Sequence, residues 1–172
     1  DWLVSNAGIS TYDKFQDYTF EEWNNIVNTN LSIPVFMVKE LMPVMTEGGS
    51  VLFMGSYAGR QAYSSSVVYG VTKAAIHFLT KSLVKEFEPK KIRVNAIAPG
   101  FFIGDQNRRV LINPDGSLTD RSKKVLAKTP MNRFGDIKEL NGAVQFLCSE
   151  AASFVTGAML PIDGGFSAFS GV

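Results

Sequence analysis

The chain has 172 residues, 45% of them hydrophobic and 19% charged, which fits one globular domain that can bury a core. Its 17 Lys and Arg residues nearly balance 16 Asp and Glu residues, so no overall charge attracts nucleic acid or an acidic membrane. The single cysteine, Cys148, cannot form an internal disulfide bond, and no apolar run is long enough to cross a bilayer. We therefore expect a cytoplasmic protein that binds neither nucleic acid nor membranes.

Short apolar runs alternate along the chain with patterns of helical period. In chain order we predict a strand over 2–5, a helix from a cap at Thr19 and Glu22 to about Met45, a strand over 50–54, a helix over 68–87, a strand over 92–98, a short helix near 120–128, a helix over 137–149 and a strand over 158–162. This alternation predicts an α/β fold, a three-layer Rossmann-type doubly wound parallel sheet that forms a single domain over residues 1–172.

Three of the expected strands end in small, turn-forming residues. These ends are Asn6-Ala7-Gly8, Gly55-Ser56 and Pro99-Gly100. In an open parallel sheet, ligands bind outside the carboxyl ends of the strands. The layout alone therefore predicts a binding site along this rim.

Tyr69 and Lys73 are four residues apart in the second long helical pattern. That spacing puts them on one face of the helix, about 6 Å apart along its axis. A lysine ammonium beside a phenol favours the phenolate, so we expect Lys73 to lower the pKa of Tyr69 from its usual value of about 10. The pair would then exchange a proton with a carbonyl or hydroxyl oxygen while hydride moves at the carbon. Taken alone, this spacing is also common on helix surfaces.

Ser56 and Asn30 strengthen that interpretation. Ser56 follows a buried strand by two residues, where its hydroxyl can hold the oxygen that Tyr69 protonates, although turn serines are common. Asn30 lies four residues before Pro34, which has no N–H to donate to the Asn30 carbonyl. We expect a kink there and a free carbonyl that accepts a hydrogen bond from a water, which links Lys73 to solvent. A helix bent to follow the core, with an incidental Asn, is the alternative.

The order and spacing of several motifs resemble those of the short-chain dehydrogenase/reductase family. The motifs are Asn6-Ala7-Gly8, Asn30-Leu31, Ser56, Tyr69-x-x-x-Lys73, Asn95, Pro99-Gly100, Val155-Thr156-Gly157 and Asp163-Gly164-Gly165. The resemblance covers essentially the whole chain. It implies an oxidoreductase that transfers hydride between NAD or NADP and a carbonyl or secondary alcohol.

The resemblance also implies roles for individual residues. In the catalytic tetrad, Tyr69 is the acid and base, and Ser56 orients the substrate. Lys73 also binds the nicotinamide ribose, and Asn30 supports a chain of waters. The implied cofactor contacts are Asn6, Ala7, Gly8, Tyr69, Lys73, Pro99, Gly100 and Phe102. No cluster of His, Cys and carboxylate residues has the spacing of a metal site, so no metal is expected.

Residues 101–130 correspond to the substrate lid of that family. Gln106, Arg108 and Arg109 suit the hydroxyls and carboxylate of a sugar acid, although a solvated basic helix face explains such residues equally well. Arg121, Lys123 and Lys124 extend the basic character of the lid. The lid and the last ten residues resemble a sugar-acid branch, the D-mannonate oxidoreductases or fructuronate reductases. The alternatives are a 3-oxoacyl carrier protein reductase and a non-catalytic nucleotide-binding protein.

The resemblance further implies a homotetramer or homodimer that acts on a small-molecule substrate.

The chain departs from the family pattern in two places. Gly104 occupies the place of a threonine that contacts the nicotinamide, and the strands and glycine-rich loop that hold the pyrophosphate should precede Asp1. We therefore expect a longer protein and no activity from these 172 residues alone. We expect His77 at the surface or an interface, and Cys148 in the core.

Overall fold

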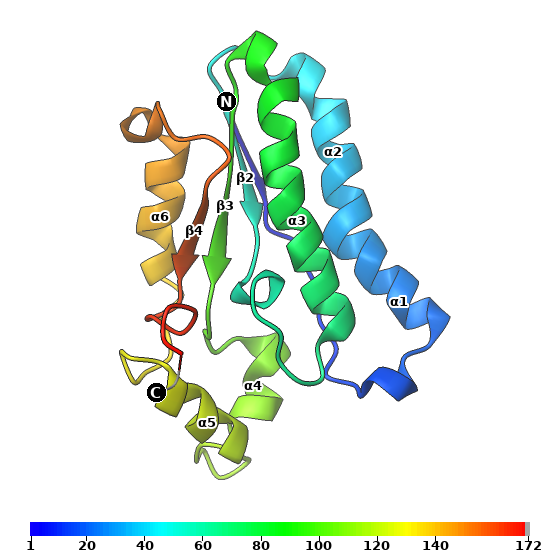
Figure 1. Ribbon diagram of the computed structural model, residues 1–172, viewed down its shortest axis with the longest axis vertical. Coiled ribbons are helices and arrows are strands. Elements are labelled where there is room, and N and C mark those ends of the chain that lie inside the picture. The colour runs from blue at the N-terminus through cyan, green and yellow to red at the C-terminus, as the bar shows by residue number, and fades with distance from the viewer. Residues whose placement is uncertain (171–172) are drawn as a thin grey trace.

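Four parallel strands form the centre of the molecule, which the computed structural model describes over residues 1–170 (Figure 1). The strands are β1 (Trp2–Ser5), β2 (Ser50–Met54), β3 (Arg93–Pro99) and β4 (Met159–Ile162), hydrogen-bonded in that order. Every neighbouring pair is parallel. The predicted α/β class and all four strands are confirmed, because no strand boundary differs from the prediction by more than one residue.

Helices cover both faces of the sheet. The helices are α1 (Phe20–Val27), α2 (Ile33–Leu41), α3 (Val67–Glu86), α4 (Asp105–Leu111), α5 (Asp120–Lys128) and α6 (Glu139–Cys148). Figure 1 shows α1, α2 and α3 on one side of the sheet, α6 on the other, and α4 and α5 beyond the arrowheads of the strands. This is the predicted three-layer arrangement. Among residues 1–170, no helix combines the length and the apolar character that a membrane crossing requires.

Each face of the sheet buries its own apolar core. Successive residues of a strand point to opposite faces, so β2 sends Val51 and Phe53 to one side and Leu52 to the other. The first side packs against α2 and α3 through Val38, Ile76 and their neighbours. The second side packs against α6 through Leu147, Cys148 and Ala152, which confirms Cys148 as a core thiol.

The helix predicted to begin at Thr19 is divided in its middle. Its cap is confirmed, because the Glu22 N–H donates to the Thr19 hydroxyl (3.1 Å) and the Thr19 N–H donates to the Glu22 carboxylate (2.8 Å). A π-helical turn over Asn28–Ser32 then separates α1 from α2. Pro34 supplies the physical reason, because it has no N–H for the usual bond to the Asn30 carbonyl. The irregularity expected at Asn30 is thus present as a π-helical turn, and the helical backbone continues through it into α2.

The lid over residues 101–130 contains two helices, of which only α5 was predicted. The missed helix, α4, begins at a local cap in which the Asn107 side chain accepts a hydrogen bond from the Gly104 N–H (2.9 Å). The predicted turn at 113–116 follows α4, with the Gly116 N–H donating to the Asn113 carbonyl (2.9 Å). Gly116 has a φ of 86°, a conformation that favours glycine.

Candidate active site

Lys73 joins the middle of α3 to the ends of two strands. Its ammonium donates a hydrogen bond to the Met54 carbonyl at the end of β2 (2.7 Å). A Cβ atom on Gly8, just after β1, would lie 3.4 Å from the same nitrogen. Because the two strands are parallel, these ends meet at the same edge of the sheet, where the sequence predicted a binding site.

The side chains of Ser56, Tyr69 and Lys73 lie together at this edge. The Ser56 hydroxyl lies close enough to Tyr69 to act on the pKa of that phenol, and it accepts a hydrogen bond from the Ala58 N–H (3.2 Å). The Lys73 nitrogen lies 5.6 Å from the centre of the Tyr69 ring. Ser56 and Lys73 are both buried. The three groups that the sequence singled out thus lie near one another, and their catalytic roles stay predictions.

The pKa of Tyr69 shifts in the direction opposite to the one expected. Burial raises the pKa of Tyr69 to about 12, and the nearby Ser56 hydroxyl acts against that rise. The nearby phenols of Tyr63 and Tyr12 also raise it. Lys73 is not among the groups that lower the pKa of Tyr69, and burial lowers the pKa of Lys73 itself to about 8. The expectation that Lys73 lowers the pKa of Tyr69 below its usual value is therefore wrong.

Asn30 uses its side chain to tie three segments together. Its Oδ1 accepts a hydrogen bond from the Ile9 N–H (2.8 Å), and its Nδ2 donates to the Ile9 carbonyl (2.9 Å) and to the Thr72 hydroxyl (3.2 Å). The loop after β1 is thus fixed to the π-helical turn and to α3, one residue before Lys73. The water relay at the Asn30 carbonyl stays a prediction.

His77 is buried, with 6% exposure, which corrects its expected place at the surface or an interface. Its Nε2 accepts a hydrogen bond from the Ser56 main-chain N–H (3.3 Å). The ring fits only because Gly55 and Gly59 lack side chains, since a Cβ on either would lie 2.6 Å from a ring atom. Burial lowers the pKa of His77 to about 4, so the imidazole is neutral at pH 7. The spacing of one turn from Lys73 was the signal that sequence reasoning overlooked.

The other residues that the family resemblance assigns to the cofactor also lie along the carboxyl edge. A Cβ on Gly100 would lie 2.7 Å from the Asp163 Cα, so the ends of β3 and β4 touch there. Phe102 and Asp163 border a cavity of about 410 Å³. Asn6 and Ala7 are exposed just after β1. Their cofactor contacts stay predictions. Among residues 1–170, no group of three or more His, Cys, Asp or Glu side chains could hold a metal ion.

The three substrate residues that were predicted in the lid share α4 but do not form one cluster. The Gln106 amide donates a hydrogen bond to the Gly8 carbonyl (2.9 Å), which ties the lid to the rim. Arg109 is close enough to Tyr12 to act against the raised pKa of that phenol. Arg108 lines a separate hollow beside the turn at 113–116, together with Arg109. Their roles in substrate binding stay predictions.

Sequence reasoning missed an aromatic and basic cluster beside Tyr69. The Arg121 guanidinium in α5 lies 5.3 Å from the centre of the Tyr12 ring and 5.4 Å from that of Tyr63. Arg121 and Tyr63 border a cavity of about 400 Å³ that Phe101 also lines. These residues are far apart in the sequence and follow no motif. Only the fold brings them together.

Comparison with known proteins identifies sequences similar to nearly the whole chain. A family model described as enoyl-(acyl carrier protein) reductase matches residues 1–167. An uncharacterised oxidoreductase of Bacillus subtilis (strain 168), UxuB, is 42% identical over 193 residues, covering 100% of this chain and 68% of its own. The 3-oxoacyl-[acyl-carrier-protein] reductase FabG of Escherichia coli (strain K12) is 34% identical over 167 residues, covering 96% and 66% respectively. The chain thus spans about two thirds of the length of these relatives.

Solved structures share the fold closely. A structure from Haemophilus influenza with bound NAD, provisionally named D-mannonate oxidoreductase, has a TM-score of 0.92 at 34% identity and covers 100% of this chain and 69% of its own. A structure from Agrobacterium tumefaciens with bound NADP, provisionally named 2-deoxy-D-gluconate 3-dehydrogenase, has a TM-score of 0.86 at 33% identity, with coverages of 98% and 68%. Both similarities extend over the strands and helices that carry the site.

Proposed function

Because the chain belongs to the short-chain dehydrogenase/reductase family, we propose that the protein transfers hydride between NAD or NADP and a carbonyl or secondary alcohol. The observation that carries this proposal is the buried Lys73 ammonium 5.6 Å from the Tyr69 ring, with the buried Ser56 hydroxyl near the same phenol. A scaffold protein without catalysis would have no need of three such groups at one strand edge.

The surroundings of Lys73 fit a nicotinamide cofactor. An ammonium has three N–H groups, and in the described residues 1–170 Lys73 uses one of them, on the Met54 carbonyl. Lys73 is also buried, at 3% exposure, and burial alone accounts for its lowered pKa. A buried cation with spare donors suits the ribose hydroxyls of the cofactor. The nicotinamide supplies or accepts the hydride when it is bound, and Gly8 and Pro99-Gly100 would lie along the cofactor.

Tyr69 holds and moves the proton in this proposal. Its pKa of about 12 keeps the phenol protonated at neutral pH, so Oη can donate to a carbonyl oxygen as the carbon is reduced. The Ser56 hydroxyl, which lies near Tyr69, would hold that oxygen in line. The ammonium of Lys73 would stabilise the negative charge that the departing proton leaves on Tyr69.

The proposed substrate is a sugar acid of the D-mannonate or D-fructuronate type. The provisional name of the Haemophilus structure supports this class. The basic residues of the lid also support it, because Arg109 and Arg121 both lie near Tyr12. The second candidate is reduction of a 3-oxoacyl carrier protein, which the 34% identity to FabG favours.

A substrate panel with the full-length protein tests both candidates. NADH and NADPH oxidation should be followed with D-fructuronate and with a 3-oxoacyl thioester, and the reverse reaction with D-mannonate. We expect turnover of the sugar acids and loss of about 1,000-fold or more in the Tyr69→Phe variant, since proton transfer typically contributes 10² to 10⁴. Turnover of the thioester alone would replace the sugar-acid proposal, and a Tyr69→Phe variant as active as the parent would end the hydride-transfer proposal.

We also propose that the protein assembles as a homotetramer or homodimer through the outer faces of α2 and α3. These faces expose Ile33, Phe36, Val71 and Phe78 to solvent in the single chain. Large apolar side chains gathered on neighbouring helices favour burial against another subunit. Light scattering on the full-length protein should give the mass of two or four chains, and Phe36→Lys or Phe78→Lys should reduce it.

A further inference from the structure

Arg121 presents a charged group without an acidic partner. In the described residues 1–170, no carboxylate lies within ion-pair distance of Arg121 and no group accepts a hydrogen bond from it, whereas its helix neighbour Lys123 pairs with Asp120 at 3.1 Å. Arg121 is partly buried, so its charge is incompletely hydrated. A partly buried guanidinium with five free N–H groups is suited to an anionic ligand.

Two tyrosine rings hold this guanidinium in place. The ring centres of Tyr12 and Tyr63 lie 5.3 and 5.4 Å from it, on segments far apart in the chain. Stacking on aromatic rings stabilises the cation and limits its rotation, while its N–H groups remain free to bind a carboxylate in two-point fashion. The two rings thus hold the N–H donors of the Arg121 guanidinium in a fixed orientation before a ligand binds.

The same two tyrosines connect Arg121 to the reacting centre. Tyr12 and Tyr63 are both close enough to Tyr69 to raise the pKa of that phenol. Arg121 and Tyr63 both border the cavity of about 400 Å³, whose lining also includes Lys124 and Lys128. A space of this size accommodates a small organic acid, and every charge on its wall is positive.

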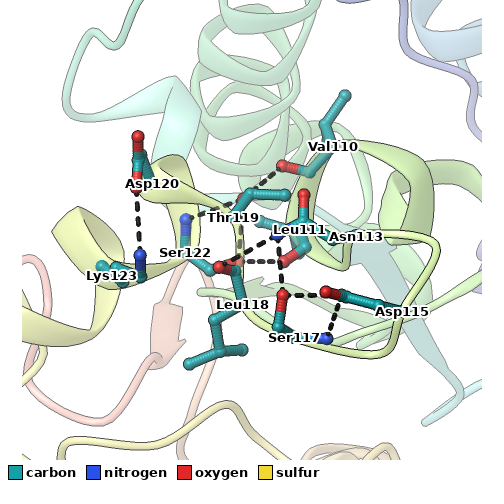
Figure 2. Close-up of polar contacts among 10 residues, drawn as sticks. All are labelled: Val110, Leu111, Asn113, Asp115, Ser117, Leu118, Thr119, Asp120, Ser122 and Lys123. Carbon is teal, nitrogen blue, oxygen red and sulfur yellow. Dashed lines mark hydrogen bonds and ion pairs between the residues drawn. The ribbon is translucent and has the colours of Figure 1, made fainter.

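Hydrogen bonds within the lid fix the backbone immediately before and after Arg121. The Thr119 hydroxyl donates to the Val110 carbonyl (2.9 Å) and accepts from the Ser122 N–H (3.2 Å), which caps α5 (Figure 2). The Ser122 hydroxyl donates to the Leu111 carbonyl, and Ser122 is fully buried. Arg121 therefore projects from an anchored helix turn, as a specificity-determining residue should.

We propose that Arg121, held between Tyr12 and Tyr63, binds the carboxylate of the substrate while Tyr69 acts on its carbonyl or hydroxyl group. This inference rests on the proposed sugar-acid function and names the residue that recognises the acid. It places the anion site on α5, apart from the hollow at the turn 113–116 that Arg108 lines.

The test compares an aldonic acid with the neutral alditol of the same length and configuration. Calorimetric titration of the full-length protein, saturated with the reduced cofactor so that the acid cannot be oxidised, gives a dissociation constant for each compound. For Arg121→Met we expect about 10- to 100-fold weaker binding of D-mannonate, the range for a charge-assisted hydrogen-bonded pair, and less than about twofold change for D-mannitol. Arg121→Lys should fall between, because it keeps the charge but loses the second donor.

Lys123→Met, on the exposed side of the same helix, is the matched control and should change neither constant. Equal losses for the acid and the alditol in Arg121→Met would overturn the inference while leaving the sugar-acid function standing. So would a selective loss in Arg108→Met with Arg121→Met unaffected. If the parent protein bound the alditol as tightly as the acid, the sugar-acid function itself would fail, and this inference with it. Circular dichroism on each variant confirms that it is folded.

Discussion

The main-chain N–H of Ser56 donates a hydrogen bond to Nε2 of His77 across 3.3 Å, and both residues are buried. The ring lies in a gap that two glycines leave, Gly55 before the serine and Gly59 after it. The turn that carries the Ser56 hydroxyl is thereby fitted around one imidazole on α3, one helical turn beyond Lys73. This contact positions the serine against Tyr69 without touching the substrate.

Replacing His77 should therefore lower the rate without weakening cofactor binding. His77→Phe keeps most of the ring volume but leaves the Ser56 N–H without an acceptor, which costs about 1–3 kcal/mol. We expect kcat to fall about tenfold or more, with little change in KM for the cofactor. His77→Gln keeps an acceptor near the position of Nε2 and should recover most of the rate. If both variants lost the same activity, a positioning role for the acceptor would be excluded.

His77 should also make the fold sensitive to acid. Burial lowers the pKa of His77 to about 4, from an unfolded value of 6.5. Between these values the unfolded chain binds more protons, so the free energy of unfolding is highest above pH 6.5 and falls as the pH drops towards 4. His77 is the only histidine of the 172 residues. Melting temperatures measured from pH 7 to 4 should fall less steeply in His77→Gln than in the parent protein.

The sheet and the reacting groups could both be predicted from the sequence, but for different physical reasons. Strands such as Ser50–Met54 are short apolar runs between glycines, and that local pattern is enough to place them. Tyr69 and Lys73 share a helix, so their proximity follows from helical spacing alone.

The parts that escaped prediction depend on tertiary contacts. The inward direction of His77 depends on two glycines of a distant turn, and the Arg121 cluster on three segments that meet only in the fold. The pKa of Tyr69 was assigned the wrong direction because burial, which no local pattern reveals, is the largest influence on it and raises it.

Lys73 should lower the free energy of unfolding of the protein, although its proposed role is in catalysis. A pKa of about 8 instead of 10.5 means that keeping Lys73 charged in the folded state costs about 3 kcal/mol. Lys73→Met removes that cost but also the bond to the Met54 carbonyl, worth about 1 kcal/mol. We expect a net gain of about 1–2 kcal/mol in the free energy of unfolding at pH 7 without cofactor.

The same shift gives Lys73 a pH signature. Because the unfolded chain holds the proton up to about pH 10.5 and the folded chain only to about 8, the stability due to this group rises between those values. That rise should be missing in Lys73→Met and present in the exposed control Lys39→Met. Denaturant unfolding at pH 7 and pH 9.5 checks both statements, and a Lys73→Met variant less stable than the parent at pH 7 would contradict them.

Gly59 and Gly142 allow a comparison of the same Gly→Ala substitution at a tightly packed position beside the site and at an open position in α6. A Cβ on Gly59 would lie 2.6 Å from both the His77 ring and the Lys73 backbone, so Gly59→Ala should cost about 1–3 kcal/mol. Gly142 lies inside α6 with nothing within 4 Å of its ideal Cβ, so Gly142→Ala should stabilise by about 0.5–1 kcal/mol. Thermal unfolding of the two variants should therefore shift in opposite directions, and a neutral Gly59→Ala would show that the turn is not tightly packed.

The effect of Ser56 on the pKa of Tyr69 should be visible in the pH dependence of oxidation. In that direction Tyr69 must accept a proton, so only its deprotonated form is active, and the rate rises as the pH approaches its pKa. The nearby Ser56 hydroxyl lowers that pKa against the effect of burial. Ser56→Ala should therefore move the alkaline rise of kcat/KM to higher pH, in addition to lowering the rate. Ser82→Ala, which removes an exposed hydroxyl from the same helix as Tyr69, should leave the profile unchanged. A Ser56→Ala profile that keeps its midpoint while the rate falls would mean that the serine acts on the substrate oxygen alone.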